Sequence, residues 1–354
     1  MIEIQSSTLK EALKQVGPAI DRRSVIKAFQ CVRLRIDGTQ FEMIGGGTEG
    51  QATHRAALEF PVSESLDVCV EADRLAPLLA VANDSVSITI QKNERVKFAT
   101  SSYNVAIPSL PGSVFPMVKA DDQIKASTDV SGIAGLIGGV LFAANPRDIR
   151  EFCRGVWIES DGEQISATAT NGNVLATAQV PMAAAPFAVL ISTDAAEMLV
   201  ALDPQNIALT DAHFTASNGA TDLVIKPMSF KPVDWRRTLP DPKNSITFEG
   251  APLRDAVSMY RHYGDKIGGL RFSTEGEECT LEVVNTQNDA TVDLDVEFSD
   301  EESTFNFAFI GAQLSQILQR APDEKVTFFW NASNPRAFLV QNGNWRGVIS
   351  PLTV

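Results

Sequence analysis

The sequence has few cysteines, and they stand far apart. The four are Cys31, Cys69, Cys153 and Cys279, and none belongs to a CxxC pair. This spacing excludes a zinc site built on paired cysteines and a small domain held together by disulfides. Unpaired thiols are typical of a reducing compartment, so the sequence predicts a cytoplasmic protein.

Long apolar runs are missing too. The longest candidate, around residues 132–144, is shorter than the roughly 18 residues that a membrane-spanning helix needs. The first residues, MIEIQSSTLKEALKQ, contain no apolar core of a secretory signal. We therefore expect neither a membrane anchor nor secretion.

Positive charge is scarce. The chain has 30 Lys and Arg against 44 Asp and Glu, which gives a net charge of −14 and a pI near 4.7. This balance excludes a uniformly basic nucleic-acid-binding surface, so any contact with DNA must be local. With 44% hydrophobic and 21% charged residues over 354 positions, we expect two or three globular domains.

Motifs of catalysis are absent. The sequence holds no P-loop, HExxH or GxSxG segment. Its three histidines, His54, His213 and His262, lie in different parts of the chain and do not suggest a shared metal site. We expect no enzyme activity, no cofactor and no metal.

One glycine-rich segment needs separate treatment. Residues 45–50 (GGGTEG) match the GxGxxG pattern of dinucleotide-binding loops. That pattern requires a strand before it and a helix after it, whereas residues 51–61 continue better as a sheet and no βαβ unit flanks them. We interpret the segment as a hairpin tip, and a dinucleotide-binding oxidoreductase stays as a remote alternative.

What the chain does contain is one pattern repeated three times. Strand-like starts at residues 2–4, 124–126 and 246–248 are 122 positions apart both times, and each precedes a helix-like segment. Each repeat then has an apolar run that ends at an acidic residue followed by glycine. Such a pair is typical of a β-hairpin turn, because glycine adopts positive φ without steric cost.

A second helix and further strands complete each repeat. In the first repeat, Leu75, Leu78 and Leu79 are spaced i, i+3, i+4, which predicts one apolar stripe, and Pro77 is expected within the first few helical residues. Proline-rich residues 108–113 and 231–243 are expected to be linkers rather than strands. We therefore predict three domains, at residues 1–115, 121–230 and 243–354.

Three short segments carry a family resemblance. Residues 169–176 (ATNGNVLA) resemble an ATDGHRLA segment, residues 234–240 (DWRRTLP) a DYRRVLP segment, and residues 348–352 (VISPL) a VVMPM ending. Together with the three tandem repeats, they make the whole chain similar to the bacterial DNA polymerase III beta subunit, the sliding clamp. Asn171, Asn173 and Val174 replace the family's Asp, His and Arg, which indicates a divergent member and leaves its choice of partners open.

The resemblance implies an α+β fold. It consists of three tandem DNA-clamp domains, each with two helices backed by antiparallel sheets, which together form half of a closed ring. The ring would be a head-to-tail homodimer with helices around its hole, in which Val105 and Ile107 of one subunit contact His262 and Tyr263 of the other. The alternative is that these four are ordinary strand and helix residues.

The implied function is that of a processivity factor. The ring would encircle duplex DNA without sequence specificity and would bind a replicative polymerase and a clamp loader through short hydrophobic peptides. A second hypothesis keeps the fold but makes the protein a clamp-like scaffold or decoy for a different peptide, since the pocket residues are altered.

Basic residues on or beside the predicted helices are the candidates for DNA contact. Lys10 and Lys14 are spaced i, i+4 on the first helix, opposite an apolar face, and such residues would meet phosphates without reading bases. The alternative is that they only solvate a surface. The full set is Lys10, Lys14, Arg22, Arg23, Arg74, Arg147, Arg150, Arg254, Arg261 and Arg320.

The partner pocket is implied between the second and third repeats. An apolar trough with a few polar groups suits a short hydrophobic peptide, and Val174 should make it more apolar. Plain core packing is the alternative for Val174, Leu175 and Val348. The implied pocket residues are Thr170, Gly172, Asn173, Val174, Leu175, Pro232, Arg237, Thr238, Val348, Ser350, Pro351 and Leu352.

Overall fold

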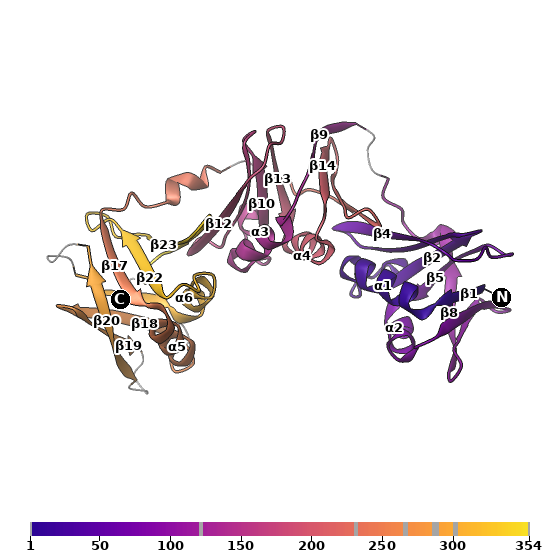
Figure 1. Cartoon of the computed structure of the whole chain (residues 1–354), viewed down its shortest axis with the longest axis horizontal. Helices are drawn as coiled ribbons and strands as arrows, with labels where there is room; N and C mark the ends of the chain where they lie inside the picture. Colours follow the sequence, from indigo (N-terminus) through magenta and orange to yellow (C-terminus); the bar gives the residue numbers. More distant parts are fainter. Residues whose placement is uncertain are drawn as a thin grey trace. The chain divides into compact units, whose positions relative to one another are not determined.

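The helices and strand starts that the repeats predict are present in the computed structural model, which describes residues 2–119, 123–229, 233–264, 268–284, 290–299 and 304–352. The order strand, helix, four strands, helix, three strands occurs three times along the chain (Figure 1). This order agrees with the sequence repeats, while the domain limits 1–115, 121–230 and 243–354 stay a prediction.

The elements of the three repeats have the following bounds. The first repeat contains β1 (Ile2–Gln5), α1 (Ser6–Val16), β2 (Cys31–Asp37), β3 (Gln40–Gly46), β4 (Gly50–Ala57), β5 (Leu66–Glu71), α2 (Ala72–Val81), β6 (Ser85–Gln91), β7 (Arg95–Ala99) and β8 (Asn104–Pro111). The second contains β9 (Ile124–Asp129), α3 (Ile133–Val140), β10 (Gly155–Ser160), β11 (Gln164–Thr170), β12 (Val174–Pro181), β13 (Phe187–Ser192), α4 (Thr193–Leu202), β14 (Asn206–Thr210), β15 (Phe214–Ser217) and β16 (Thr221–Ile225). The third contains β17 (Asn244–Glu249), α5 (Gly250–Tyr260), β18 (Gly269–Glu275), β19 (Glu278–Val283), β20 (Thr291–Phe298), β21 (Phe307–Ile310), α6 (Gly311–Leu318), β22 (Lys325–Trp330), β23 (Phe338–Asn342) and β24 (Trp345–Ile349).

By its contacts the chain divides into two compact units. The first comprises residues 1–138, 159–163 and 182–229, and the second comprises residues 139–158, 164–181 and 230–354. Among the described helices, none combines the length and the apolar character needed to cross a membrane.

The first unit is built on one antiparallel sheet of twelve strands. Its order is β1-β6-β7-β8-β5-β2-β3-β4-β16-β15-β14-β9. Helix α1 buries Leu9, Ala12 and Val16, which recur at helical spacing, and it packs on β3, β4 and α2. The opposite face of α1 carries Lys10 and Lys14, as its spacing predicted.

The second unit has a sheet in which β10, β11, β12, β24, β23, β22, β17, β20, β19, β18 and β21 follow one another. Its core is aromatic. The Phe305 ring is fully buried, and its centroid lies 5.3 Å from that of Trp330 and 5.6 Å from that of Phe338. Helices α5 and α6 pack against each other (Figure 1).

Two predictions about proline are wrong. Pro77 is the sixth residue of α2, which starts at Ala72, so it lies inside the helix and not in its first turn. Both Pro77 and Asp73 are exposed, so water can bond the carbonyl that would otherwise accept the missing N–H.

The second wrong prediction is the linker expected at residues 108–113. Strand β8 continues to Pro111. It pairs with β7 up to Pro108 and with β5 from Ser109 onward, so Pro108 stands where the strand changes partner and a missing N–H interrupts neither ladder. The other expected linker is free of strands over its described part, residues 233–243.

The glycine-rich segment is a hairpin tip, as predicted. Strand β3 ends at Gly46 and β4 begins at Gly50, and the Gly47 N–H donates to the Gly50 carbonyl over 2.9 Å. A strand therefore follows the segment where a dinucleotide-binding loop has a helix.

Candidate partner pocket, DNA-facing cations and open strand edges

A cavity of about 590 Å³ opens in the second unit beside the pairing of β12 with β24. Five parts of the chain line it: residues 150–157, the β11–β12 turn, residues 233–241, the connection from β22 to β23, and residues 348–350 at the end of β24. The lining residues are Arg150, Phe152, Trp157, Thr170, Gly172, Asn173, Val174, Leu175, Val233, Trp235, Arg237, Thr238, Leu239, Pro240, Asp241, Asn331, Asn334, Arg336, Ala337, Val348 and Ser350.

Most of the residues predicted for the pocket line this one cavity. They are Thr170, Gly172, Asn173, Val174, Leu175, Arg237, Thr238, Val348 and Ser350. Pro351 and Leu352 are not among the lining residues, because the chain turns after β24 and the Leu352 N–H donates to the Ala308 carbonyl of β21 over 2.7 Å. Pro232 lies outside the described residues.

The floor of the cavity is also part of the core. Val174, Leu175 and Val348 are at most 5% exposed, as core residues are, and they also line the cavity, while their contact with a peptide stays a prediction. A ligand would touch their edges and would find more apolar surface on Val233, which is 41% exposed. Val174 brings no charge to this floor.

The β11–β12 turn is built by its own side chains. The Asn171 Oδ1 accepts the N–H of Asn173 over 3.0 Å and that of Val174 over 2.9 Å, and the Thr170 hydroxyl donates to the Val174 carbonyl over 2.7 Å. Asn171 thus organises the turn in place of the family's Asp. Gly172 has φ +90°, which a side chain would strain.

Arg150 packs on this turn. Its Nη2 donates to the Asn171 carbonyl over 2.7 Å, and a Cβ on Gly172 would come within 2.5 Å of its Nη1. Asp148 binds the guanidinium through two bonds of 2.9 Å, and these bonds lower the pKa of Asp148 to about 2. Arg150 was a candidate for DNA contact, but its side chain lines the cavity.

Residues 233–241 form the opposite wall. Trp235 is buried in the short helix Trp235–Thr238, and the guanidinium of Arg236 lies 4.4 Å from its ring centroid. The Thr238 hydroxyl donates to the Trp235 carbonyl over 2.6 Å. Arg237 pairs with Asp234, Nε to Oδ2, over 2.9 Å.

Sequence reasoning missed about half of the lining. Trp235 and Leu239 stand inside the DWRRTLP segment and could have been carried over with it. Asn331, Asn334 and Arg336 lie on a connection between strands, where composition and periodicity contain no signal.

Comparison with known proteins agrees with this fold. No family model matches the chain. The chain is 25% identical to the beta sliding clamp of Pseudomonas aeruginosa over 96% of both sequences, and 25% identical to that of Vibrio cholerae over 87% of both. A crystal structure of the DNA polymerase III subunit beta from P. aeruginosa superposes with a TM-score of 0.89 at 21% identity over 99% of both chains.

The chain is similar to bacterial beta sliding clamps. This confirms the resemblance and the α+β clamp fold that the sequence predicted. Another solved sliding clamp from P. aeruginosa, bound to griselimycin, has a TM-score of 0.90 at 22% identity over all of this chain and 99% of that one. The low identities agree with a divergent relative of the sliding clamps.

The cations predicted to meet DNA in a sliding clamp fall into two groups. Among the described residues, the side chains of Lys10, Lys14, Arg23 and Arg147 have no hydrogen-bond or ion-pair partner. The others have partners inside the chain: Arg22 with Asp73, Arg74 with Glu71, Arg150 with Asp148, Arg254 with the carbonyls of Ala321 and Asp323, Arg261 with Ser315, and Arg320 with the Phe142 ring.

The strand predicted for subunit contact in a sliding clamp has an open edge. On β8, residues 104–108 pair with β7 on one side and with no described strand on the other. Val105 is 41% exposed there, whereas Ile107 is buried. On the other predicted surface, His262 and Tyr263 are both exposed just after α5.

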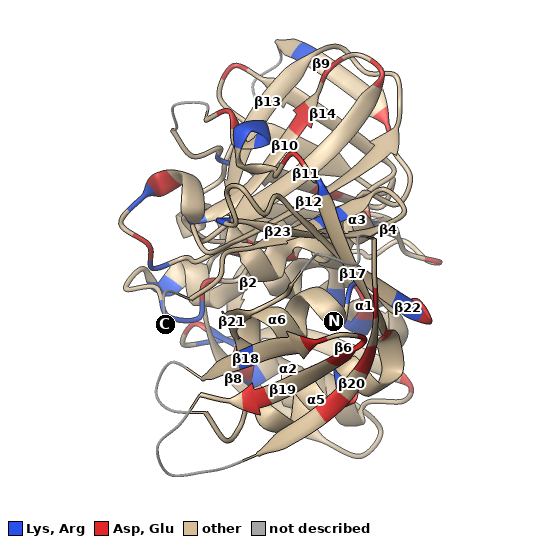
Figure 2. Ribbon diagram, turned by 90° about the vertical axis from the view of Figure 1, so that its left-hand side faces the viewer, with Lys and Arg blue, Asp and Glu red and all other residues tan. Residues whose placement is uncertain are grey.

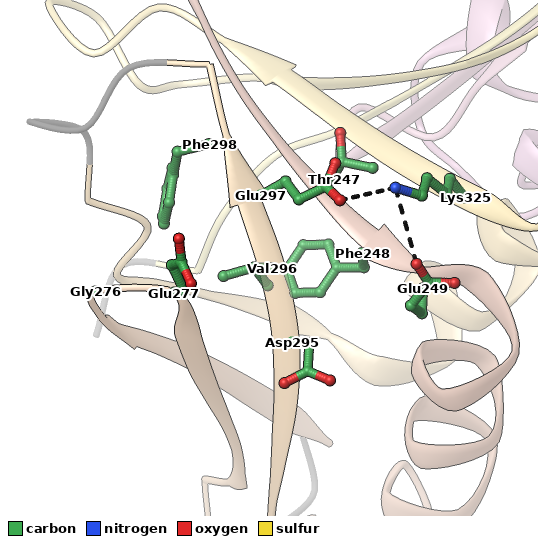
Figure 3. A pocket seen from close by; sticks show the side chains of 10 residues that line it. All are labelled: Thr247, Phe248, Glu249, Gly276, Glu277, Asp295, Val296, Glu297, Phe298 and Lys325. Carbon is green, nitrogen blue, oxygen red and sulfur yellow. Dashed lines mark hydrogen bonds and ion pairs between the residues drawn. The ribbon is translucent and has the colours of Figure 1, made fainter.

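Within the part of the chain that the structure describes, β20 is a second strand with an open edge. Residues 291–295 pair with β19, and β17 joins the other side only at 296–298. A cavity of about 720 Å³ lies at this point, and Glu249, Glu277, Asp295 and Glu297 are among the residues that line it (Figure 3). Lys325 lies 2.8 Å from Glu297 and 3.9 Å from Glu249, measured from Nζ to Oε1.

Proposed function

We propose that the chain is one subunit of a DNA sliding clamp, a processivity factor without catalysis of its own. Two subunits would close into a ring around duplex DNA in the cytoplasm. The ring would hold a polymerase and accept a clamp loader through short hydrophobic peptides.

The observation that carries the proposal is a strand pairing that occurs twice. Strand β4 pairs with β16, and β12 pairs with β24, each through five residue pairs. In both cases the third strand after the first helix of one repeat joins the last strand of the next repeat. The third repeat has such a strand in β20, the first repeat has such a last strand in β8, and both have open edges.

Head-to-tail association satisfies both edges. The β20 edge of one subunit would pair with the β8 edge of the next, and two subunits would then bury every such edge in a ring of six repeats. Val105 would be a side-chain contact, whereas the buried Ile107 would contribute through its backbone. His262 and Tyr263 are exposed just after α5, and they would take part in the same contact between subunits.

Charge favours this pairing. Asp293, Asp295 and Glu297 are exposed on β20, and β7, beside β8, carries the exposed Arg95 and the half-buried Lys97. Figure 2 draws the acidic positions of β20 in red. Opposite charges on the two edges would select the head-to-tail orientation and disfavour pairing of like edges.

The free cations support weak binding to phosphates. Lys10, Lys14, Arg23 and Arg147 are available, while the other candidates already bond within the chain. A protein held on DNA by topology needs few such contacts, because each phosphate neutralised adds affinity and would slow sliding.

Retention on circular DNA tests the proposal. The protein is loaded onto a nicked plasmid with the clamp loader of its source, and the plasmid is then linearised or left intact. We expect retention on the circle and loss from the linear form. Equal loss from both, or a mass in solution of one 38.3 kDa chain at the concentrations used, would contradict a ring.

The altered pocket supports a second candidate, a clamp-fold scaffold or decoy for a different peptide. Val174 removes a positive charge from the floor relative to the family. A protein that stays on circular DNA but does not bind polymerase-type clamp peptides would favour the scaffold or decoy.

A further inference from the structure

A side chain of the chain itself bonds one backbone group of β20. The hydroxyl of Tyr260, the last residue of α5, donates to the carbonyl of Thr291, the first residue of β20, over 2.9 Å. Tyr260 is 8% exposed, so packing fixes the position of its ring. Helix α5 therefore holds the start of β20 through one hydrogen bond.

The Thr291 carbonyl belongs to the open edge of β20. Backbone groups of successive strand residues point to opposite sides. The Ala290 carbonyl accepts the Val283 N–H of β19, whereas the Ser299 N–H donates to the Ser245 carbonyl of β17. Thr291 alternates with Ala290, so its N–H and C=O point away from β19, where no described strand pairs with it.

Threonine occupies this position in all three repeats. A glycine with positive φ lies in the turn between the first two strands after each first helix, and the residue six positions further along pairs with a threonine of the third strand. In chain order the glycine, that residue and the threonine are Gly38, Ile44 and Thr53, then Gly162, Thr168 and Thr177, then Gly276, Glu282 and Thr291.

The first two threonines pair with the next repeat. Thr53 pairs with Asp222 of β16, and Thr177 pairs with Arg346 of β24. Thr291 therefore stands where a strand of a second copy would pair with β20.

The residue of the second copy that would meet Thr291 follows from the other end of each repeat. The residue three positions before each second helix binds the segment that follows or ends the last strand. These contacts are Cys69 with Leu110, the Leu190 carbonyl with the Met228 N–H, and the Ala308 carbonyl with the Leu352 N–H. Asp222 and Arg346 stand six positions before Met228 and Leu352, and Asn104 stands six positions before Leu110.

Asn104 has its backbone groups on the correct side. The neighbouring Tyr103 carbonyl accepts the Thr100 N–H within the β7–β8 hairpin, so the N–H and C=O of Asn104 face the open edge of β8. In a head-to-tail pair the Asn104 N–H of the second copy would therefore meet the Thr291 carbonyl that the Tyr260 hydroxyl holds.

We propose that the Tyr260 hydroxyl competes with a second copy of the chain for the Thr291 carbonyl, and thereby weakens the contact between subunits. The free subunit keeps this edge carbonyl satisfied, and ring closure exchanges one hydrogen bond for another instead of adding one. A ring that gains less on closing is easier to open for loading. The inference rests on the proposed function, since it assumes that β8 pairs with β20.

The test measures the dissociation constant of the dimer by sedimentation equilibrium for the full chain, Y260F and Y263F. Y260F removes the hydroxyl and keeps the ring. Y263F is the matched control, because it removes a hydroxyl from the same predicted surface and leaves the bond to Thr291 intact. Oxidation of V105C/A290C tests the register, which places these two positions opposite each other; the four native cysteines are buried.

We expect Y260F to lower the dissociation constant about tenfold, or about threefold for each of the two contacts in a ring, because the free subunit loses a bond that the ring does not use. Y263F should not tighten the dimer. V105C/A290C should form a covalent dimer on oxidation.

Other results would overturn the inference in distinguishable ways. If the covalent dimer forms but Y260F dissociates like the natural chain or more readily, the competition is refuted and the proposed ring stands. Equal tightening by Y260F and Y263F would assign the effect to a less polar surface and refute the role of the Thr291 carbonyl. If every variant stays monomeric and V105C/A290C forms no covalent dimer, the proposed ring fails together with the inference.

Discussion

The two strand pairings between repeats share one geometry and differ in chemistry. In the β4–β16 pairing the buried side chains include Gln51, Thr53, His54 and Thr221, and the His54 Nδ1 lies 2.8 Å from the Thr221 Oγ1. The β12–β24 pairing is mainly apolar, and a cavity opens beside it. The same backbone register therefore gives a polar contact in one place, the β4–β16 seam, and an apolar contact beside a cavity in the other, the β12–β24 seam.

The β4–β16 and β12–β24 pairings are stabilised by different interactions. The polar β4–β16 seam depends on hydrogen bonds, which are costly to break once buried. The apolar β12–β24 seam depends on buried area, to which Trp345 contributes a large ring whose Nε1 donates to the Gly139 carbonyl over 3.0 Å. The two seams should respond to different perturbations.

The largest expected effect comes from Trp345→Ala. Loss of this ring, which is 9% exposed, should lower the free energy of unfolding of the second unit by about 3–4 kcal/mol. Urea unfolding followed by tryptophan fluorescence measures it, because Trp157, Trp235 and Trp330 all lie in the second unit. Trp345→Phe should cost about 1 kcal/mol for the hydrogen bond, and equal losses in both variants would refute the role of area.

A pair of glycines sharpens the comparison next. Gly172 and Gly219 both have φ +90°, but a Cβ at 172 would meet the Arg150 guanidinium, whereas nothing lies within 4 Å of one at 219. Both alanine variants should lose about 1–2 kcal/mol to backbone strain.

Only Gly172→Ala should also weaken peptide binding, because Arg150 must move away from the pocket wall. Calorimetry with a polymerase-type clamp peptide measures this difference. If Gly219→Ala weakened peptide binding by the same factor, the local role of Arg150 would be wrong.

The smallest expected effect is a pH dependence confined to the polar seam. Burial lowers the pKa of His54 below its ordinary 6.5, and the negative charge of Glu11 offsets this in part. Because the unfolded chain then binds the proton more readily, the contribution of His54 is complete above pH 6.5 and is lost as pH falls through its folded pKa.

Hydrogen exchange of the β4 and β16 amides between pH 7 and 5, corrected for intrinsic rates, should show this loss, and His54→Gln should reduce it. The tryptophan-reported stability of the second unit should not change with the His54 substitution. A pH response of the β4–β16 amides that His54→Gln leaves intact would assign it to another group.

Much of the architecture could be predicted from sequence, since strand starts, acidic-glycine turns and apolar stripes are local patterns. The course of β8 through Pro108 could not, because it depends on a change of partner between β7 and β5. Arg150 was assigned to DNA for its charge alone. Only the fold brings it against Gly172, 22 positions further along the chain.

By itself, the sequence determined the threefold order of elements, the acidic balance that restricts contact with DNA, and the turn from Thr170 to Val174, because each depends on neighbours in the chain or on composition. Over the described residues, the tertiary structure decided which strands keep open edges and which arginines find a partner far along the chain. Those outcomes depend on partners far away in the sequence, such as Asp73 for Arg22, and on strand pairings between segments more than 160 positions apart, as for His54 and Thr221.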